Sequence, residues 1–179
     1  MFCSRHLPWA SVNGLWPEHS LFDTALSFYL ADESATQALG ARLAAVVQPG
    51  LIVYLRGDLG AGKTALVRAM LHALGYSGKV KSPTYTLVEL YKVSDLCLYH
   101  FDFYRFSEPD EWIEAGFRDY FSAQAACFVE WPDQAGGLLP PADLAIAMAV
   151  QGAGRQVEIR ASSPEGSRCL NVLATGEQP

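Results

Sequence analysis

The sequence predicts a single α/β domain, and three observations indicate it. The chain has 179 residues, half of them hydrophobic, which is enough for one well-buried core and short for two. A glycine-rich loop stands between an apolar run and a helical pattern over residues 51–70. Further short apolar runs, each bounded by polar or turn residues, follow toward the C-terminus.

The glycine-rich loop is residues 57–64, GDLGAGKT, which fit G-x-x-x-x-G-K-[ST] at every fixed position. The apolar run at 51–55 predicts a buried strand before it. Apolar residues at helical spacing follow it until Gly75, which is placed to end a helix. A glycine-rich turn could match the pattern by chance, but it would not require a strand before it and a helix after it.

The residue types in this loop suit phosphate binding. Glycines let successive N–H groups turn inward toward phosphate oxygens, and the helix that begins near Gly62 adds the positive end of its dipole. Lys63 can reach the β- and γ-phosphates, and the Thr64 hydroxyl can bind Mg²⁺. We therefore predict a nucleotide site that comprises Gly57, Asp58, Leu59, Gly60, Ala61, Gly62, Lys63, Thr64 and Ala65.

Before the loop, the pattern predicts one strand and one helix. Residues 21–30 could form the strand. Asp32 or Ser34 is placed to cap a helix whose apolar residues recur at helical spacing until Pro49. Residues 1–20 lack periodicity, so we interpret them as a loosely held extension of the domain.

After the loop, residues 80–91 combine a polar first half, broken by Pro83, with a strand-like second half. Ser82 and Thr84 offer hydroxyls that could close over a γ-phosphate and Mg²⁺. An ordinary loop followed by a threonine-bearing strand fits the spacing equally well.

Residues 96–105 predict a strand with polar groups at its C-terminal end, where ligands bind in open α/β sheets. His100, Asp102 and Tyr104 recur with period two and are expected to share one face. Asp102 could bind Mg²⁺ or orient an attacking water. A turn-capping or salt-bridged aspartate is the alternative.

Residues 108–120 predict short helical pieces broken at Gly116, and residues 125–129 then predict a buried strand that ends in Glu130. Several apolar residues followed by an acid have the form of a Walker-B strand, whose acid holds the Mg²⁺ shell or polarises water. An acid that only caps the strand end is the alternative. Trp131 could stack on a base or fill core space.

Residues 144–150 and 156–161 predict two strands of a hairpin, and residues 162–179 are weakly patterned. We therefore place the domain at 21–162, with residues 1–20 as an extension and 163–179 as a C-terminal tail.

Composition limits the class of protein. The net charge is −6 without a Lys/Arg block, which disfavours direct binding to DNA or RNA, so a role in RNA metabolism would act through a partner protein. No apolar run approaches the ~20 residues of a membrane span. The first residues lack the apolar core of a secretion signal, so we expect a cytoplasmic protein. The four cysteines are scattered and predict neither a disulfide framework nor a metal site.

Four motifs occur in order: GDLGAGKT at 57–64, KSPTYTLVE at 81–89, HFDFYR at 100–105 and VEWP at 129–132. Their combination resembles the TsaE family (older name YjeE), small bacterial ATPases of tRNA threonylcarbamoyladenosine biosynthesis. The match spans roughly residues 30–155. The first motif is shared with many families, and the other three are specific to this one.

The resemblance implies a P-loop NTPase-like single domain with a mixed central sheet flanked by helices. It implies an ATP-binding protein that hydrolyses ATP slowly with Mg²⁺ and acts as a switch on two partner proteins, TsaB and TsaD. The modified adenosine lies beside the anticodon of tRNAs that read codons beginning with A. The tRNA would be reached only through that complex.

The resemblance also implies roles for individual residues. Lys63, Asp102 and Glu130 would be catalytic, and Thr64 and Glu130 would hold Mg²⁺. Ser82-Pro83-Thr84 resembles a switch segment, and Trp131 would lie next to the nucleotide. Asp32, Gly154 and Arg155 match positions near the nucleotide, although a helix-capping role for Asp32 is equally compatible. The sequence departs from the family pattern at Tyr85, Glu89-Leu90 and Phe106.

Two other functions remain open from the sequence. A P-loop small-molecule kinase would require an arginine-bearing lid, whereas the arginines here are dispersed. A binding module without hydrolysis is disfavoured because Asp102 and Glu130 are both present.

Overall fold

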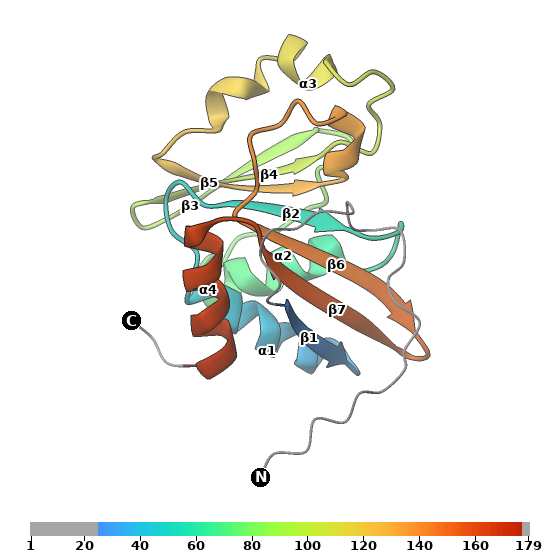
Figure 1. The fold of residues 1–179 in the computed structure, drawn as a ribbon, viewed down its shortest axis with the longest axis vertical. Helices are drawn as coiled ribbons and strands as arrows, with labels where there is room; N and C mark the ends of the chain where they lie inside the picture. Colours follow the sequence, from blue (N-terminus) through green and yellow to red (C-terminus); the bar gives the residue numbers. More distant parts are fainter. Residues whose placement is uncertain (1–24, 177–179) are drawn as a thin grey trace.

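The computed structural model describes residues 25–176, which fold around one mixed seven-stranded sheet with the order β1-β7-β6-β2-β5-β4-β3 (Figure 1). Strands β2, β4, β5 and β6 are parallel to their neighbours among these four, while β1, β3 and β7 pair antiparallel. The predicted α/β fold with a mixed sheet is therefore confirmed. The strands are β1 (Ala25–Leu30), β2 (Ile52–Arg56), β3 (Val88–Val93), β4 (Leu96–Asp102), β5 (Ala125–Glu130), β6 (Leu144–Gln151) and β7 (Gly154–Ala161).

Three longer helices cover one face of the sheet: α1 (Glu33–Ala44), α2 (Lys63–Ala73) and α4 (Pro164–Thr175) (Figure 1). The core beneath them is mainly aliphatic. The alternation of β2 explains its two-sided packing, because Val53 and Leu55 face this core while Ile52 and Tyr54 face the opposite one. The helices contribute Leu39, Leu43, Leu66, Val67, Met70, Leu71, Cys169, Leu170 and Leu173 to the aliphatic core.

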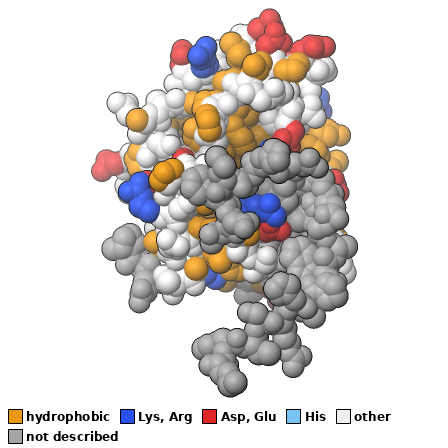
Figure 2. Space-filling view, viewed as in Figure 1, with side chains coloured by type: hydrophobic (Ala, Val, Ile, Leu, Met, Phe, Trp, Pro, Cys, Tyr) orange, Lys and Arg blue, Asp and Glu red, His pale blue; other side chains and the backbone are white. Residues whose placement is uncertain are grey.

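Short elements cover the opposite face: α3 (Glu111–Glu114) and the 3₁₀ helices η1 (Phe117–Tyr120) and η2 (Pro132–Ala135). Gly116, with φ 75°, separates α3 from η1, as the sequence predicted. This second core is aromatic, and Phe101 stacks on Phe121 with ring centroids 5.2 Å apart. Figure 2 shows acidic side chains at the end of the molecule where α3 lies.

The sheet topology brings distant parts of the chain to one edge. The carboxyl ends of parallel strands meet at the same edge of a sheet, so β2, β4, β5 and β6 all end there. Strand β7 runs antiparallel to β6 and begins at this edge, and β1 runs antiparallel to β7 and ends at it. The residues at these strand ends, or next to them in the chain, therefore lie close together in space. They include Asp32, Gly57, Asp102, Glu130 and Arg155.

The segment that we interpreted as a C-terminal tail is largely helix α4. Ser163 caps this helix by accepting a hydrogen bond from the N–H of Gly166, and Gly176 ends it with φ 71°. Cys169, Leu170 and Leu173 are buried against the sheet. The prediction missed the helix because its apolar stripe is only a few residues long; the Ser163-Pro164 start and the Gly176 end were its detectable signals.

Other element boundaries differ little from the prediction. The described part of the first strand begins at Ala25, and the predicted extension at 1–20 lies outside the described residues. The hairpin turn is shorter than predicted, since β6 and β7 extend to Gln151 and Gly154. Strand β4 ends at Asp102, so Tyr104 lies in the following turn and does not share the strand face predicted for it. In the described part of the chain, no helix has the length and apolar character needed to cross a membrane.

Candidate nucleotide-binding site

The loop between β2 and α2 depends on glycine at its first position. Gly57 has φ 135°, and a Cβ atom there would lie 2.2 Å from the carbonyl oxygen of Met148 on β6. Gly60 and Gly62 also have positive φ, 80° and 105°. The loop therefore follows a path that side chains at these glycines would disfavour, and it lies directly against the sheet edge.

The loop leads into the N-terminus of α2. Gly62 is the N-cap residue and supplies no side chain to the first turn. The backbone N–H groups of that turn have no intrahelical partner, and the helix dipole places partial positive charge there. This end of α2 is therefore suited to bind an anion such as a phosphate group.

Lys63 is buried inside the loop, with only 4% of its surface exposed. Its Nζ donates hydrogen bonds to the carbonyl oxygens of Gly57 (2.7 Å) and Asp58 (3.0 Å) and lies 4.3 Å from the centre of the Trp131 ring. Burial lowers the pKa of Lys63, and the nearby carboxylate of Glu130 partly offsets that effect. The ammonium group is thus held at the loop by backbone oxygens and by the face of an aromatic ring.

Glu130 lies at the carboxyl end of β5 and connects the loop to the sheet. Its Oε1 accepts hydrogen bonds from Thr64 Oγ1 (2.7 Å) and His100 Nε2 (2.9 Å), and its Oε2 lies 4.0 Å from Lys63 Nζ. Burial alone would raise the pKa of this carboxyl group. The hydrogen bonds from His100 and Thr64, together with the charges around it, hold the pKa below its usual range. Glu130 is therefore a buried carboxylate in contact with the threonine of the loop.

Asp102 stands beside Glu130, because the two residues are register partners at the ends of β4 and β5. Its Oδ2 accepts a hydrogen bond from Thr84 Oγ1 (2.5 Å), and the Thr84 hydroxyl lies 2.8 Å from that of Ser82. Its Oδ1 accepts from the backbone N–H of Tyr104 (2.9 Å). The structure thus brings the polar segment at 82–84 to the carboxylate, and it also gives Asp102 the turn-capping contact that the alternative interpretation expects.

Trp131 follows Glu130 with φ 58°, in the left-handed region that a bulky side chain rarely occupies. Its ring contacts Lys63 on one side and the Tyr104 ring, at 5.0 Å, on another. An ion pair between Arg56 and Asp133 holds the chain just beyond it. The strained backbone therefore places this ring at the rim of the aromatic core, where it also faces Lys63 of the glycine-rich loop at 57–64.

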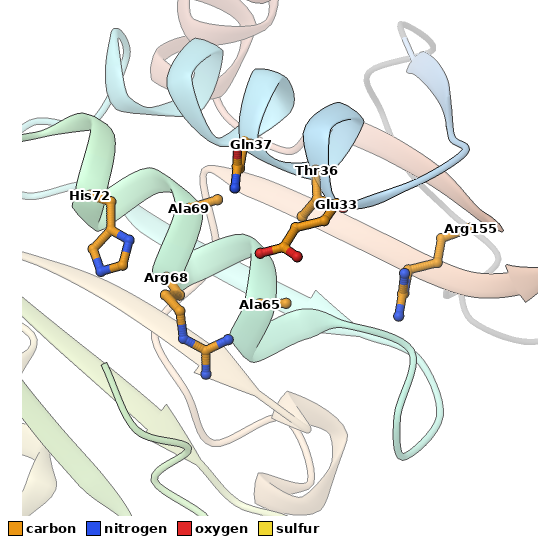
Figure 3. Close-up of a pocket in the computed structure, with 8 residues that line it drawn as sticks. All are labelled: Glu33, Thr36, Gln37, Ala65, Arg68, Ala69, His72 and Arg155. Atoms are coloured by element: carbon orange, nitrogen blue, oxygen red, sulfur yellow. The ribbon is translucent and has the colours of Figure 1, made fainter. Parts of the chain in front are cut away.

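A pocket of about 360 Å³ lies between α1 and α2 and is bordered by Ala65, in the first turn after the glycine-rich loop (Figure 3). Arg155 borders it from β7, and the space that a Cβ atom on Gly62 would need is taken by Arg155 Nε at 2.7 Å. That Nε atom is buried and has no hydrogen-bond partner among residues 25–176. The pocket is lined by Glu33, Thr36, Gln37, Ala65, Arg68, Ala69, His72 and Arg155.

Two of the residues suggested by short motif matches have structural roles. Asp32 caps α1, since its Oδ1 accepts a hydrogen bond from the N–H of Ala35 at 2.8 Å. Gly154 lies against β1, where a Cβ atom would be 2.5 Å from the carbonyl oxygen of Leu30. Neither residue lines the pocket, whereas their neighbours Glu33 and Arg155 do.

The capping role of Asp32 leads to a stability prediction. Asp32→Ala should lower the free energy of unfolding by about 1 kcal/mol, because the first turn of α1 loses a side-chain acceptor. Asp32→Ser, which keeps a capping oxygen, should lose only a few tenths of that amount. Urea denaturation of both variants checks the prediction, and equal losses in the two would contradict it.

The geometry fits a chain of phosphate groups together with Mg²⁺. The start of α2 presents unpaired N–H groups, Lys63 supplies a buried cation, and Thr64 and Glu130 pair a hydroxyl with a carboxylate at one point. No group of three or more His, Cys, Asp or Glu side chains that could hold a metal ion occurs within residues 25–176. Mg²⁺ commonly takes only one or two protein ligands and completes its shell with phosphates and water.

Sequence reasoning missed two features of the site. His100 was recognised only as a neighbour of Asp102 on its strand, although its position two residues before that carboxylate was a usable signal. The pocket between α1 and α2 depends on helix packing, which the sequence pattern does not specify. Its lining side chains Arg68, His72 and Gln37 carry no motif.

Comparison with protein-family models matches residues 30–157 to the family described as threonylcarbamoyl adenosine biosynthesis protein TsaE. The chain is 38% identical over 155 residues to the tRNA threonylcarbamoyladenosine biosynthesis protein TsaE of Haemophilus influenzae, covering 84% of this chain and 98% of that one. It is 38% identical over 106 residues to the protein of the same name from Bacillus subtilis, covering 59% and 66%. A crystal structure of YdiB from Bacillus subtilis has a TM-score of 0.73 with it at 28% identity, covering 86% and 96%.

Proposed function

Because the chain belongs to the TsaE family of threonylcarbamoyl adenosine biosynthesis proteins, we propose that it binds and hydrolyses ATP with Mg²⁺ to serve this tRNA modification. The observation that carries the proposal is the hydrogen bond between Thr64 and Glu130. It joins the last residue of the phosphate loop to the acid at the end of the neighbouring strand. This is the pairing that a Mg²⁺–nucleotide site requires.

Different residues would contact different parts of the nucleotide. The backbone of the loop and Lys63 would hold the phosphates, and Thr64 and Glu130 would hold Mg²⁺, which when bound neutralises charge on the β- and γ-phosphate oxygens. The nucleoside would enter the pocket beside Arg155, whose unpartnered Nε and charge suit an electron-rich group. Trp131 would border the phosphates from the opposite side.

For hydrolysis, we assign Asp102 to orient the attacking water. Its carboxylate is held by Thr84 and by the backbone of Tyr104, so its oxygens have defined directions before any ligand binds. Preorganised groups of this kind lower a barrier because they need no rearrangement during the reaction. Lys63 would stabilise the charge that develops on the transferred phosphoryl group.

The proposed switch is the segment from Ser82 to Leu87. Thr84 links it to Asp102, and the backbone of Leu87 accepts a hydrogen bond from the N–H of Asp102. Between these anchors Tyr85 is 82% exposed, with the Arg105 guanidinium over its ring. A change at Asp102 on hydrolysis would therefore reach an exposed aromatic side chain, through which TsaB and TsaD could sense the nucleotide state.

ATP hydrolysis by the purified protein, alone and with TsaB, TsaD and tRNA, tests the proposal. We expect the partners to change the rate of phosphate release and the tRNA to gain threonylcarbamoyl only in the complete mixture. A rate that ignores the partners but rises with a small-molecule phosphate acceptor would instead identify a kinase. ATP binding without phosphate release under any of these conditions would identify a binding module.

A further inference from the structure

His100 is a fully buried histidine to which the proposed function assigns no role. It lies on β4 with 0% of its surface exposed, two residues before Asp102 and on the same side of the sheet as Leu98 and α2. Its Nε2 lies 2.9 Å from Glu130 Oε1. A polar ring at such depth requires a partner, and in residues 25–176 that partner is the Glu130 carboxylate.

The surroundings of the ring fix the position of its proton. An ionised carboxylate can only accept hydrogen bonds, so the Nε2 atom of His100 must donate to Glu130. The other ring nitrogen, Nδ1, is buried and has no hydrogen-bond partner among the described residues. A buried N–H group without an acceptor would be costly, which favours the tautomer that carries the proton on Nε2.

Two donors from different elements thus fix one oxygen of Glu130. Thr64 donates from the start of α2 and His100 from β4, and both reach Oε1. The second oxygen, Oε2, is left facing the loop, 4.0 Å from Lys63 Nζ. With Thr64 as the only donor, the carboxylate could rotate about that single hydrogen bond.

That rotation would bring the carboxylate closer to the Lys63 ammonium group, which lies next to it in a buried site. Opposite charges at this depth attract strongly. An ion pair closer than the present 4.0 Å contact between Glu130 and Lys63 would withdraw the carboxylate from Mg²⁺ and the ammonium group from the phosphates. The hydrogen bond from His100 opposes this rotation, since it holds Oε1 at β4 and so keeps Oε2 at 4.0 Å from Lys63 Nζ.

We propose that His100 is a positioning residue that keeps the Glu130 carboxylate turned toward Mg²⁺ and limits its contact with Lys63 to the 4.0 Å ion pair. The proposal rests on the proposed function, because it assumes the Mg²⁺–ATP site at Thr64 and Glu130. It assigns His100 no contact with the nucleotide. Its effect should therefore appear in the coupling between Mg²⁺ and ATP, and much less in the binding of metal-free ATP.

Two variants of similar volume test this: His100→Met, which has no donor, and His100→Gln, whose amide places a donor near the position of Nε2. For each variant, ATP affinity is measured by calorimetry in Mg²⁺ and in EDTA. The dissociation constant in EDTA divided by the dissociation constant in Mg²⁺ gives the Mg²⁺ coupling. His100→Met should reduce this ratio by roughly 10- to 100-fold, the usual loss when a group that orients a metal ligand is removed. His100→Gln should stay within about threefold of the parent protein.

The outcomes separate this proposal from the proposed function. A parent protein that shows no Mg²⁺-coupled ATP binding would overturn both. If the parent protein shows Mg²⁺-coupled ATP binding and the Met and Gln variants show equal Mg²⁺ coupling, only the role of His100 is overturned. His100 would then be a space-filling side chain. If His100→Met does not fold, His100→Asn replaces it, because its shorter amide cannot reach the position of Nε2.

Discussion

Replacing Lys63 by alanine should abolish measurable ATP hydrolysis and weaken ATP binding by about two to three orders of magnitude. Lys63 is the buried cation of the phosphate loop, and removing a buried, hydrogen-bonded charge from a binding site costs roughly 2–5 kcal/mol. The carbonyl oxygens of Gly57 and Asp58 would also lose their common donor. Phosphate release and calorimetric binding of ATP measure the two effects.

A second variant at position 63 separates the charge of the side chain from its packing, and a variant of an exposed lysine elsewhere serves as the control. Lys63→Met keeps an unbranched aliphatic side chain but removes the ammonium group over the Trp131 ring, and it should lose binding nearly as severely as the alanine variant. Lys92→Ala removes an exposed lysine on β3 and should behave as the parent protein. Full ATP affinity in Lys63→Met would show that the ammonium group is not what binds the phosphates.

Glu130→Gln should reduce the Mg²⁺-dependent affinity for ATP by roughly 10- to 100-fold and reduce the affinity for ADP less. The amide keeps the shape of the side chain and an oxygen that can accept from Thr64 and His100, so the fold should survive. What disappears is the negative charge that we propose pairs with Mg²⁺. The larger effect on ATP is expected because Mg²⁺ would neutralise charge on a γ-phosphate that ADP lacks.

Glu158 offers a matched control for the loss of a buried glutamate. It is as buried as Glu130, at 4% exposure, but lies on β7, where it accepts a hydrogen bond from Arg160. Glu158→Gln should change the midpoint of urea unfolding without changing the ratio of ATP affinities in Mg²⁺ and EDTA. Equal losses of ATP and ADP affinity in Glu130→Gln would count against Glu130 as the metal ligand.

The phosphate loop and its strand could be predicted from the sequence because both depend on local patterns. Gly57, Gly62 and Lys63 occur at fixed spacing, and the structure gives each a local reason for its residue type: positive φ at both glycines, a close backbone approach at Gly57, and carbonyl oxygens within reach of the lysine. The acid at the end of β5 could be predicted for the same reason, since it directly follows a run of buried residues. The nucleotide and metal roles of these residues remain predictions.

The features that the sequence did not predict depend on contacts between distant segments. That His100 meets Glu130 follows from the pairing of β4 with β5, and alternation within one strand cannot identify its neighbour in the sheet. The sequence also does not show how closely β1 approaches Gly154, which gives this glycine a packing reason beside its predicted place near the nucleotide. Helix α4 was missed because its first five residues, PEGSR, carry no apolar pattern, so that its apolar residues are confined to the part from Cys169 onward, and because its burial depends on the sheet that it covers.

The pairing of Asp102 with Glu130 has a consequence for how freely this domain can diverge in sequence. Their separation is set by main-chain hydrogen bonds between β4 and β5, and it does not depend on the identity of the side chains beneath them. Substitutions that repack the aliphatic or the aromatic core at constant volume can therefore accumulate without moving the two carboxylates. An insertion or deletion of one residue in either strand would instead turn one carboxylate to the opposite face. Strands β4 and β5 should thus tolerate substitutions in the cores beneath the two carboxylates but not changes in strand length.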